Sequence, residues 1–255
     1  MKMIWVHLVL LLQATSVFCQ IRQSTFQVSS VDSTNLILSV GSYYPLKNVV
    51  NYLNREYGWR ISYEDPFYPD NEVVDIAVPQ WKKSHPGERG FYVPKWADVR
   101  FRITKPLGKE GEQKKVITEL VEQFNRLDRP DKFTVVDASL NRNVVIGEIS
   151  GESLLGRASL GPEKKLRSGS EELQTFTEQC SAQMQMRMVI GTVSVNLMEH
   201  ITVPPRKSKI SCRDALLSLT AQGGAELVYQ LLEDINGPTY VVNIAPNRVI
   251  IHPQP

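Results

Sequence analysis

Apolar residues recur along the first part of the chain in an order that predicts a strand, a helix and a second strand. Residues 35–40 are rich in Leu, Ile and Val, and Pro45 then opens a stretch in which apolar side chains recur at helical spacing. Gly58 suits the end of this helix, because glycine readily adopts the left-handed conformation of a helix C-cap. The alternating residues that follow predict a strand that stops at Pro66, which cannot continue a hydrogen-bonded ladder.

The same order returns between residues 201 and 230. There a short strand is followed by a helix with Ser211 as its N-cap, by two glycines and by a second alternating strand. Core and cap positions of the two segments match at a constant offset of 166 residues without a gap, in seven pairs: Leu46 with Cys212, Val49 with Ala215, Val50 with Leu216, Leu53 with Leu219, Gly58 with Gly224, Ile61 with Leu227 and Tyr63 with Tyr229. This match predicts an internal repeat.

Two weaker copies lie between these units. Residues 111–136 and residues 170–190 each combine an apolar pattern of helical spacing with a following strand, and Ser170 is the expected N-cap of the second of these helices. We therefore predict an α+β fold of about four small βαβ units, paired into two lobes with short mixed sheets.

The lobes are expected to span residues 33–149 and 170–252. The stretch 150–169 between them is rich in Gly, Ser and charged residues, which is typical of a linker or a long loop. In the C-terminal lobe the turn sequence 236–238 (Asn-Gly-Pro) separates two alternating segments, so a hairpin is predicted there. The apolar residues 249–251 predict a last short strand.

Residues 1–19 have the pattern of a secretory signal peptide. Lys2 supplies a positive charge, residues 3–13 are almost wholly apolar, and small residues follow within 14–16. This run is shorter than the roughly 20 apolar residues of a transmembrane helix, and no other stretch of the chain approaches that length. We expect cleavage near residues 16–19 and an exported protein, periplasmic or secreted, without a transmembrane segment.

Export bears on the three cysteines of the chain. Phe18 stands before Cys19, where a lipoprotein signal has a small residue; this argues against lipidation of Cys19, which the sequence nevertheless leaves open. Cys180 and Cys212 both fall on predicted helices. An oxidising compartment permits a disulfide between them, and the alternative is two buried, unpaired thiols; the sequence does not decide between these states.

Charge and composition exclude several kinds of function. Lys and Arg number 29 against 27 Asp and Glu, which gives a formal net charge of +2 and no global field that would attract a polyanion. We therefore do not expect nucleic acid as a partner. Beyond residue 19 the only histidines are His85, His200 and His252, and no two have the spacing of metal ligands. The sequence predicts no catalytic residue, no metal and no cofactor.

Aromatic residues are concentrated in one region. Residues 52–101 hold eleven of the chain's 21 Phe, Trp and Tyr residues, and in the loop 66–96 several of them lie next to cations. Exposed aromatic side chains beside cations suit the binding of a protein, a peptide or a glycan. The candidate binding residues are Trp81, Lys82, Lys83, Tyr92, Lys95 and Trp96. The alternative is an aromatic cluster that only pins a long loop to the fold.

A second cluster is acidic. Within residues 64–75 the carboxylates are Glu64, Asp65, Asp70, Glu72 and Asp75. Such a group could supply the acid and base of a hydrolase that acts on cell-wall glycan or peptide, or it could bind Ca²⁺. The simplest interpretation is a solvated turn, because Pro66 and Pro69 interrupt the segment.

The segment PLKNVVNYLNREYGWRISYEDP, residues 45–66, resembles the secretin and TonB short N-terminal (STN) domain, a small βαβ-type module of exported bacterial proteins. The chain is more closely similar to a set of uncharacterised exported bacterial proteins. Those share a Gly-Trp-x-x-x-Tyr-Glu-Asp-Pro strand, here residues 58–66, and a late helix rich in Ala and Leu, here residues 214–219. They also share a following strand and hairpin, here residues 229–232 and 240–244.

This resemblance covers most of residues 33–245, and Tyr229 stands where those proteins usually have tryptophan. It implies an envelope location and a module that binds proteins or gathers substrates, and it supplies no catalytic residues. We therefore expect a non-enzymatic exported protein of the cell envelope that binds another envelope protein or cell-wall material. A cell-wall hydrolase that uses the carboxylates of residues 64–75 is the alternative.

Overall fold

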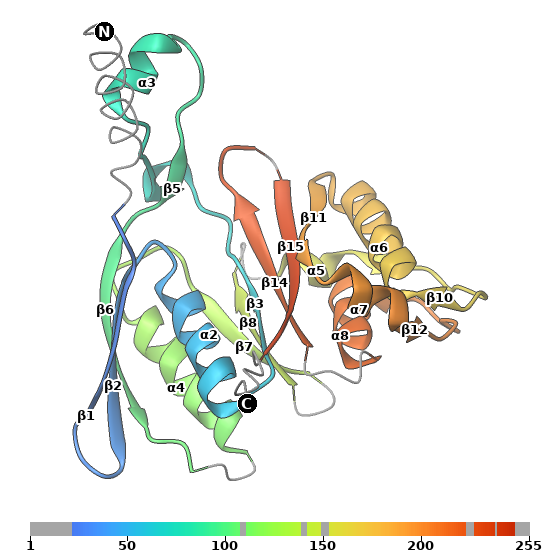
Figure 1. Cartoon of the computed structure of the whole chain (residues 1–255), viewed down its shortest axis with the longest axis horizontal. Helices are drawn as coiled ribbons and strands as arrows, with labels where there is room; N and C mark the ends of the chain where they lie inside the picture. Colours follow the sequence, from blue (N-terminus) through green and yellow to red (C-terminus); the bar gives the residue numbers. More distant parts are fainter. Residues whose placement is uncertain are drawn as a thin grey trace, which may run out of the picture.

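The computed structural model describes residues 22–107, 111–138, 142–148, 153–222, 227–237 and 239–247. The predicted signal peptide, Gly224 and the expected strand at 249–251 lie outside these residues. Helices and strands alternate in several short sheets, so the predicted α+β class is confirmed (Figure 1). Residues 22–148 are called the first half below, and residues 153–247 the second half.

The first half contains two long helices, an outer three-stranded sheet and three strands of a larger sheet. In chain order its elements are β1 (Thr25–Ser30), β2 (Asn35–Ser42), α2 (Pro45–Tyr57), β3 (Ile61–Glu64), the 3₁₀ helix η1 (Asp70–Glu72), β4 (Val73–Asp75), α3 (Pro79–Ser84), β5 (Tyr92–Pro94), β6 (Ala97–Thr104), α4 (Glu112–Asn125), β7 (Phe133–Ala138) and β8 (Arg142–Gly147).

The second half has counterparts of the two long helices and of the strands β3, β7 and β8, whereas its other strands have two residues each. In chain order its elements are α5 (Leu154–Arg157), β9 (Ser159–Leu160), β10 (Arg167–Ser168), α6 (Gly169–Met184), β11 (Arg187–Val193), α7 (Val195–His200), β12 (Thr202–Val203), β13 (Ile210–Ser211), α8 (Cys212–Gln222), β14 (Leu227–Asp234) and β15 (Thr239–Pro246). β14 and β15 form the predicted C-terminal hairpin.

A six-stranded sheet runs through both halves in the order β11-β15-β14-β3-β8-β7. In the triplet of the first half, β3 runs parallel to β8 and β8 antiparallel to β7. In the triplet of the second half, β11 runs parallel to β15 and β15 antiparallel to β14. The two triplets therefore share one order and one pairing pattern, and they meet where β14 and β3 pair in parallel.

Helices lead into both triplets in the same way. α2 precedes β3 and α4 precedes β7, just as α6 precedes β11 and α8 precedes β14. All four predicted helix–strand units are thus present, but the topology makes the first unit the counterpart of the third and the second that of the fourth. The sequence match at an offset of 166 residues instead relates the first unit to the fourth. All four units bury a helix in the same manner, so the apolar pattern alone does not distinguish these pairings.

A polar side chain near the end of α2, and likewise of α4, binds the first residue of the strand that follows. Asn54 accepts from the backbone N–H of Ile61 at 3.0 Å and donates to its carbonyl at 2.8 Å. Asn125 makes the same two bonds to Phe133, at 2.9 and 2.7 Å.

The third and fourth units carry variants of this contact. The Ser181 hydroxyl accepts from the Met188 N–H at 2.9 Å. Thr220 accepts from Arg142, which also donates to the Leu227 carbonyl at 2.8 Å. Two units thus share one contact, and the other two carry a polar side chain at the matching position, which supports the repeat.

The helices of the two halves cover opposite faces of the six-stranded sheet (Figure 1). Val145 packs with side chains of α2 and α4, whereas its neighbours Val144 and Ile146 pack with side chains of α6 and α8. Successive residues of a strand point to opposite faces, so one sheet serves two hydrophobic cores. Tyr63 and Phe133 belong to the first core, and Tyr229 and Tyr240 to the second.

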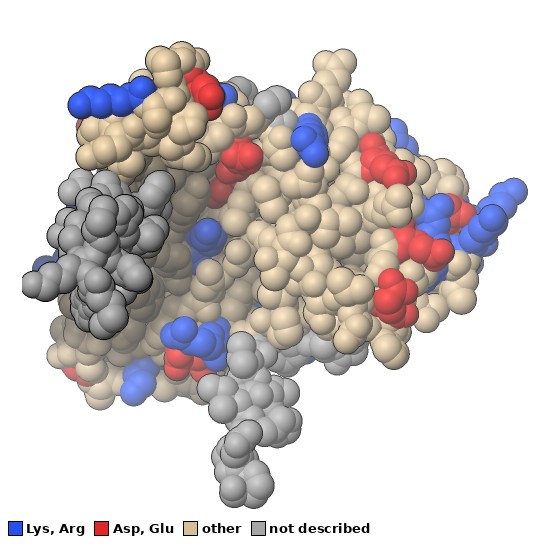
Figure 2. Space-filling model, turned by 45° about the horizontal axis from the view of Figure 1, so that its top comes forward, with Lys and Arg blue, Asp and Glu red and all other residues tan. Residues whose placement is uncertain are grey.

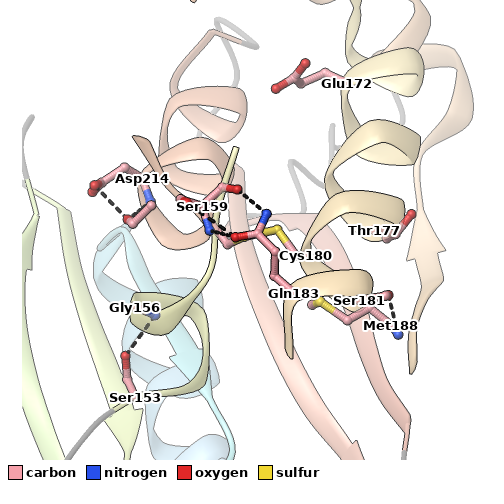
Figure 3. Close-up of a disulfide and its surroundings, with 12 residues drawn as sticks. Ser153, Gly156, Ser159, Glu172, Thr177, Cys180, Ser181, Gln183, Met188 and Asp214 are labelled. Atoms are coloured by element: carbon pink, nitrogen blue, oxygen red, sulfur yellow. Dashed lines mark hydrogen bonds between the residues drawn. A yellow bond between two sulfur atoms is a disulfide. The ribbon is translucent and has the colours of Figure 1, made fainter. Parts of the chain in front are cut away.

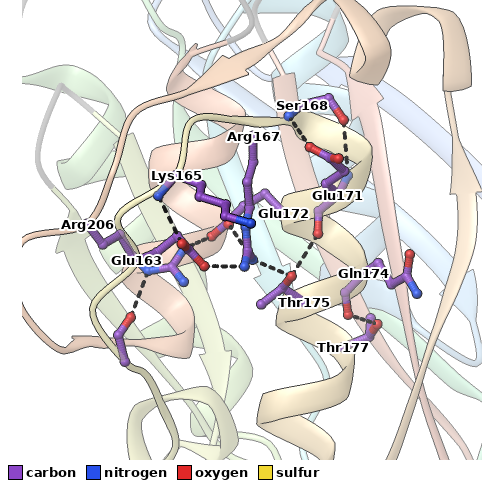
Figure 4. A network of polar contacts seen from close by, with 11 residues as sticks. Glu163, Lys165, Arg167, Ser168, Glu171, Glu172, Gln174, Thr175, Thr177 and Arg206 are labelled. Atoms are coloured by element: carbon purple, nitrogen blue, oxygen red, sulfur yellow. Dashed lines mark hydrogen bonds and ion pairs between the residues drawn. The ribbon is translucent and has the colours of Figure 1, made fainter.

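The outer covers of the two helix layers differ. In the first half, α2 and α4 lie beneath the sheet β1-β2-β6, where β2 and β6 pair over eight residues each. In the second half, residues 159–168 and 202–211 run antiparallel but pair only in the two-residue strands β9–β13 and β10–β12 and at one bridge, Glu163 with Arg206. Ion pairs reinforce this thin cover, since the buried Glu172 contacts both Arg206 and Arg167 (Figure 4).

The segment 150–169 is not a linker where it is described. Residues 154–168 form α5, β9 and β10, and Leu154, Leu155 and Leu160 are buried in the second core. The many Gly, Ser and charged residues belong to short strands and tight turns, which have the same composition as a loop. Ser168, and not Ser170, is the N-cap of α6, because its hydroxyl accepts from the Glu171 N–H while the Glu171 carboxylate accepts from the Ser168 N–H.

A disulfide joins Cys180 of α6 to Cys212 of α8, with 6.4 Å between their Cα atoms (Figure 3). Of the two states that the sequence left open, the structure has the bonded one. Nearby, the Gln183 side chain donates to and accepts from the Ser159 backbone, which ties α6 to β9. The disulfide therefore links the two helices at the centre of the second core.

Candidate binding surface

The predicted binding loop is a folded arm that projects from the first half. The arm, residues 66–96, leaves the sheet after β3 and returns at β6, and α3 lies at its far end (Figure 1). β4 and β5 pair antiparallel along it, from Val73 with Pro94 to Asp75 with Tyr92. None of its described side chains belongs to either hydrophobic core. Pro66 and Tyr68 at its root are nevertheless buried, so it is the outer part of the arm that lies apart from the two cores.

The tip of the arm is an aromatic cluster around Trp81. The indole ring of Trp81 stacks on the His85 ring at 4.7 Å between centroids, with an interplanar angle of 14°. Phe91 packs against the same indole at 4.9 Å, and the Phe91 side chain remains 51% exposed. We define the tip by these three residues. An aromatic face at the end of a projecting element leaves apolar surface exposed to water, which is unfavourable. A bound partner would cover this surface.

The cations of the arm divide into paired and unpaired ones. Lys82 pairs with Asp75 at 2.7 Å and Lys95 with Glu72 at 3.4 Å. Lys83 is exposed at the end of α3, beside the tip. Because Lys83 stands two residues from Trp81 on α3, its side chain lies on a different face of the helix.

Trp96 lies at the base of the arm and not at its tip. Its ring packs edge-on against Tyr43 at 5.1 Å, and the Arg22 guanidinium lies 4.2 Å above it. Its indole N–H donates to Asp98 at 3.0 Å. A Cβ atom at Gly41 would come within 2.9 Å of this ring, so a glycine is needed there for the close approach. Trp96 thus clamps the arm to β2 and β6.

The middle of the arm is bound to the turn of the β14–β15 hairpin. Arg89 donates to the carbonyl of Ile235 at 2.7 Å, and the Tyr92 N–H donates to the Asn236 side chain at 2.7 Å. The Arg89 guanidinium also lies 5.4 Å from the centre of the Tyr92 ring. The six predicted residues therefore do not form one patch: Trp81, Lys82 and Lys83 lie near the tip, whereas the other three hold the arm in place.

Sequence reasoning missed two parts of this surface. Phe91 and His85 complete the tip with Trp81. His85 follows Trp81 by four residues, a helical spacing that the sequence offered as a signal, whereas Phe91 reaches the indole from the chain just before β5. At the root of the arm, Phe67 is 51% exposed and lines a mainly apolar groove of about 420 Å³ with Leu154, Met184 and Met186. No local pattern in the sequence indicated that these distant residues would meet.

The first of the predicted carboxylates, Glu64, is buried in an ion pair between the halves. Arg213 of α8 contacts its two carboxylate oxygens at 2.8 Å each, and the Tyr229 hydroxyl donates to it at 2.7 Å. Arg213 also bonds to the Ser153 hydroxyl. Bidentate pairing of this kind satisfies the carboxylate and fixes α8 against β3.

Asp65 and Glu233 form an acidic latch between the root of the arm and β14. The Glu233 N–H donates to the Asp65 carboxylate at 3.1 Å, and the Tyr68 N–H donates to the Glu233 carboxylate at 2.8 Å. Burial raises the pKa of Asp65 to about 6 and the pKa of Glu233 to about 7, the latter also because Asp65 lies near it. The latch therefore holds more protons than ordinary carboxylates do at the same pH.

The other carboxylates of residues 64–75 are bound or solvated. Glu72 and Asp75 pair with lysines of the arm, and Asp70 is exposed. The structure thus divides the predicted acidic cluster into a buried ion pair, a buried latch and surface pairs. No described contact favours the hydrolase alternative, which would need an acid and a base facing a shared cleft.

Basic and acidic side chains are interspersed on the face shown in Figure 2 and do not gather in one field. Among the described residues, no group of three or more His, Cys, Asp or Glu side chains could hold a metal ion. None of the described helices combines the length and the apolar composition needed to cross a membrane.

Comparisons with known proteins add nothing to this picture: no family model, no curated protein and no solved structure matches the chain.

Proposed function

We propose that the protein is a non-enzymatic, exported protein of the cell envelope that binds another envelope protein through the tip of its arm. The observation that carries this proposal is the placement of Trp81, His85 and Phe91 at the end of a folded projection that contributes no side chain to either core. Rigid aromatic side chains contribute much of the binding energy in protein interfaces.

Two further features support the proposal. The arm is braced at its base by Trp96 and in its middle by Arg89, so the tip is held in position before a partner arrives. Preorganisation of this kind lowers the entropic cost of binding. Each half also has two helices that lead into a small mixed sheet, in keeping with the resemblance to STN modules, which implies protein interaction in the envelope.

A photo-crosslinking amino acid at Gln80, an exposed residue of α3, tests this function in the cells that produce the protein. We expect a discrete crosslinked protein from position 80, identified by mass spectrometry, and none from the matched control position Val28, which is exposed on β1. Trp81→Ala should abolish the crosslink, and Trp81→Phe should retain part of it. Equal crosslinking from both positions, or none from position 80, would refute the proposal.

A further inference from the structure

Within the six-stranded sheet, the two triplets meet through one edge strand of each triplet. β14 is the last strand of the triplet β11-β15-β14, and β3 is the first strand of the triplet β3-β8-β7. They pair in parallel, Gln230 with Tyr63 and Leu231 with Glu64, and the Asp65 N–H donates to the Leu231 carbonyl at 2.8 Å. The end of one triplet therefore pairs with the beginning of the next.

The outer edges of the six-stranded sheet are the same two kinds of edge without a partner strand. β7 is the counterpart of β14, and β11 is the counterpart of β3. Among the described strands, β7 pairs only with β8 and β11 only with β15. The two outer edges of the sheet are thus equivalent to the two edges that pair with each other at its centre.

Strand direction and the placement of the helices fix the relation between the halves. β3 and β8 run one way with β14, while β7, β15 and β11 run the other way. The second triplet is therefore reversed in direction relative to the first, and its helices lie on the opposite face (Figure 1). A half-turn about an axis across the strands, combined with a step along that axis, relates the two halves. Two such operations restore the strand direction and the helix-covered face, so they amount to a translation along the axis combined with the twist of the sheet.

We propose that copies of this chain associate head to tail, with β7 of one copy pairing in parallel with β11 of the next. A translated copy brings its β11 to β7 in the direction that parallel pairing needs, because the two edges run the same way. This contact repeats the β14–β3 junction between molecules and goes beyond the function proposed above. It is a heterologous contact, which leaves a free edge at each end and leads to open chains of molecules.

The edge strands have hydrogen-bonding groups for this contact. The Lys132 carbonyl accepts from Glu148 beside β8, and the Phe133 backbone bonds to Asn125, so Val135 and Asp137 turn their N–H and C=O groups away from β8. On β11 the Met188 N–H turns away from β15 toward Ser181, and Ile190, two residues on, has the same orientation. Ile190 is 44% exposed.

The ladder available to a second copy is short. β11 departs from regular pairing between Ile190 and Val193, and the Thr192 N–H is bound by the Asn243 side chain at 2.6 Å. Bulges of this kind limit pairing at sheet edges. We therefore expect weak association that increases with protein concentration.

Sedimentation velocity of the chain from residue 22 onward, with its disulfide intact, tests the proposal through Val135→Pro and Ile190→Pro. Each proline removes an N–H that points away from the neighbouring strand, a position that edge strands tolerate. The weight-average mass of the unmodified protein should rise with concentration beyond that of a dimer. Each variant alone should remain monomeric, whereas an equimolar mixture should form a dimer and nothing larger.

The control is Val28→Pro, which removes an equally outward N–H from β1 at the edge of the other sheet and should leave the assembly unchanged. Should a proline variant melt early, Asp137→Pro and Ile190→Lys test the same two edges. The proposal fails if the unmodified protein stays monomeric, if either variant alone still dimerises, as a symmetric contact would allow, or if the mixture stays monomeric.

Discussion

The two halves of the molecule cover the outer side of their helix layers in different ways. In the first half, the three-stranded sheet β1-β2-β6 covers α2 and α4 with a continuous layer of apolar side chains. In the second half, the same position holds only short strand pairs, and a disulfide joins α6 to α8. Cys180 occupies the place of Leu53 and Cys212 the place of Ile117, as the contacts of Asn54, Ser181, Asn125 and Thr220 align them. In the second half, the disulfide thus takes the place of the apolar burial that the three-stranded sheet provides in the first half.

The halves also differ at one connection. Between β3 and β6 the first half inserts the arm of residues 66–96, whereas the second half has only α7 between β11 and β12. The repeat therefore tolerates a long insertion at this point without loss of either core. This difference locates the specialised surface of the molecule, because the arm has no counterpart in the other half.

Loss of the disulfide should have the largest effect on stability. The bond closes a chain separation of 32 residues, so Cys180→Ser with Cys212→Ser should lower the free energy of unfolding by about 3–4 kcal/mol in urea denaturation. Cys180→Leu with Cys212→Ile installs the side chains of the first half and should recover part of this loss. If the Leu/Ile variant is as unstable as the Ser variant, the two positions are not equivalent in packing.

Removal of one member of the ion pair between the halves should have the next largest effect. Arg213→Met leaves the buried Glu64 without its partner and should cost about 3 kcal/mol in the same assay. The double variant Arg213→Met with Glu64→Met should be more stable than the single variant, because no charge is then left buried. A single variant with the stability of the unmodified protein would show that the pair does not bind the halves together.

Stability should rise on mild acidification because of the latch. The pKa values of Asp65 and Glu233 in the folded protein, about 6 and about 7, lie above the ordinary values of 3.8 and 4.5. The folded protein therefore binds more protons than the unfolded chain between pH 4 and 7, approximately, and gains stability as the pH falls through this window. We expect a gain of about 2 kcal/mol from pH 8 to pH 5, after allowance for solvent screening.

The matched variants for this titration are Asp65→Asn and Glu233→Gln. Each retains a side-chain oxygen that can accept the backbone N–H and removes one titrating group, so each should flatten the dependence of stability on pH. An unchanged slope in both variants would place the titrating groups elsewhere.

The helix ends offer the smallest effect and a direct comparison of the halves. α2 ends at Gly58 with φ of 65°, and α6 ends at Gln185 with φ of 54°, in the same left-handed conformation. Glycine adopts this conformation without the steric cost that other residues bear. Gln185→Gly should therefore raise the free energy of unfolding by about 0.5–1 kcal/mol, and Gly58→Gln should lower it by a similar amount. A Gln185→Gly variant that is less stable than the unmodified protein, or a Gly58→Gln variant that is more stable, would contradict the equivalence of the two helix ends.

Much of the fold could be predicted from the sequence, because local patterns determine it. Pro45 and Gly58 bound α2 as predicted, and Ser211 bonds to the Asp214 N–H at the start of α8. The pairing of the units could not be predicted, since strand order depends on contacts between distant segments. The folded state of residues 154–168 was missed because strands of two residues leave no periodic signal.

The candidate site was predictable in location but not in composition. The concentration of aromatic residues indicated the arm, yet the division of Trp81 and Trp96 between tip and base depends on where β4 and β5 pair. The burial of Glu64 beside Arg213 joins residues 149 positions apart, which no spacing rule relates. Sequence composition thus indicates a region, whereas tertiary contacts decide which of its residues face solvent.

Shortening of the arm tests most directly the claim that its tip binds a partner and that the two halves fold without it. Residues 77–90 are replaced by Asn-Gly, a two-residue turn that joins Ile76 to Phe91, the pair already linked by a 2.8 Å backbone hydrogen bond. The crosslinking group is moved to Val93 in both the shortened and the full-length protein. We expect the melting temperature to stay within about 3 °C of the full-length value, and the crosslink seen in the full-length protein to disappear. A shortened protein that still captures the partner, or one that no longer folds, would contradict the claim.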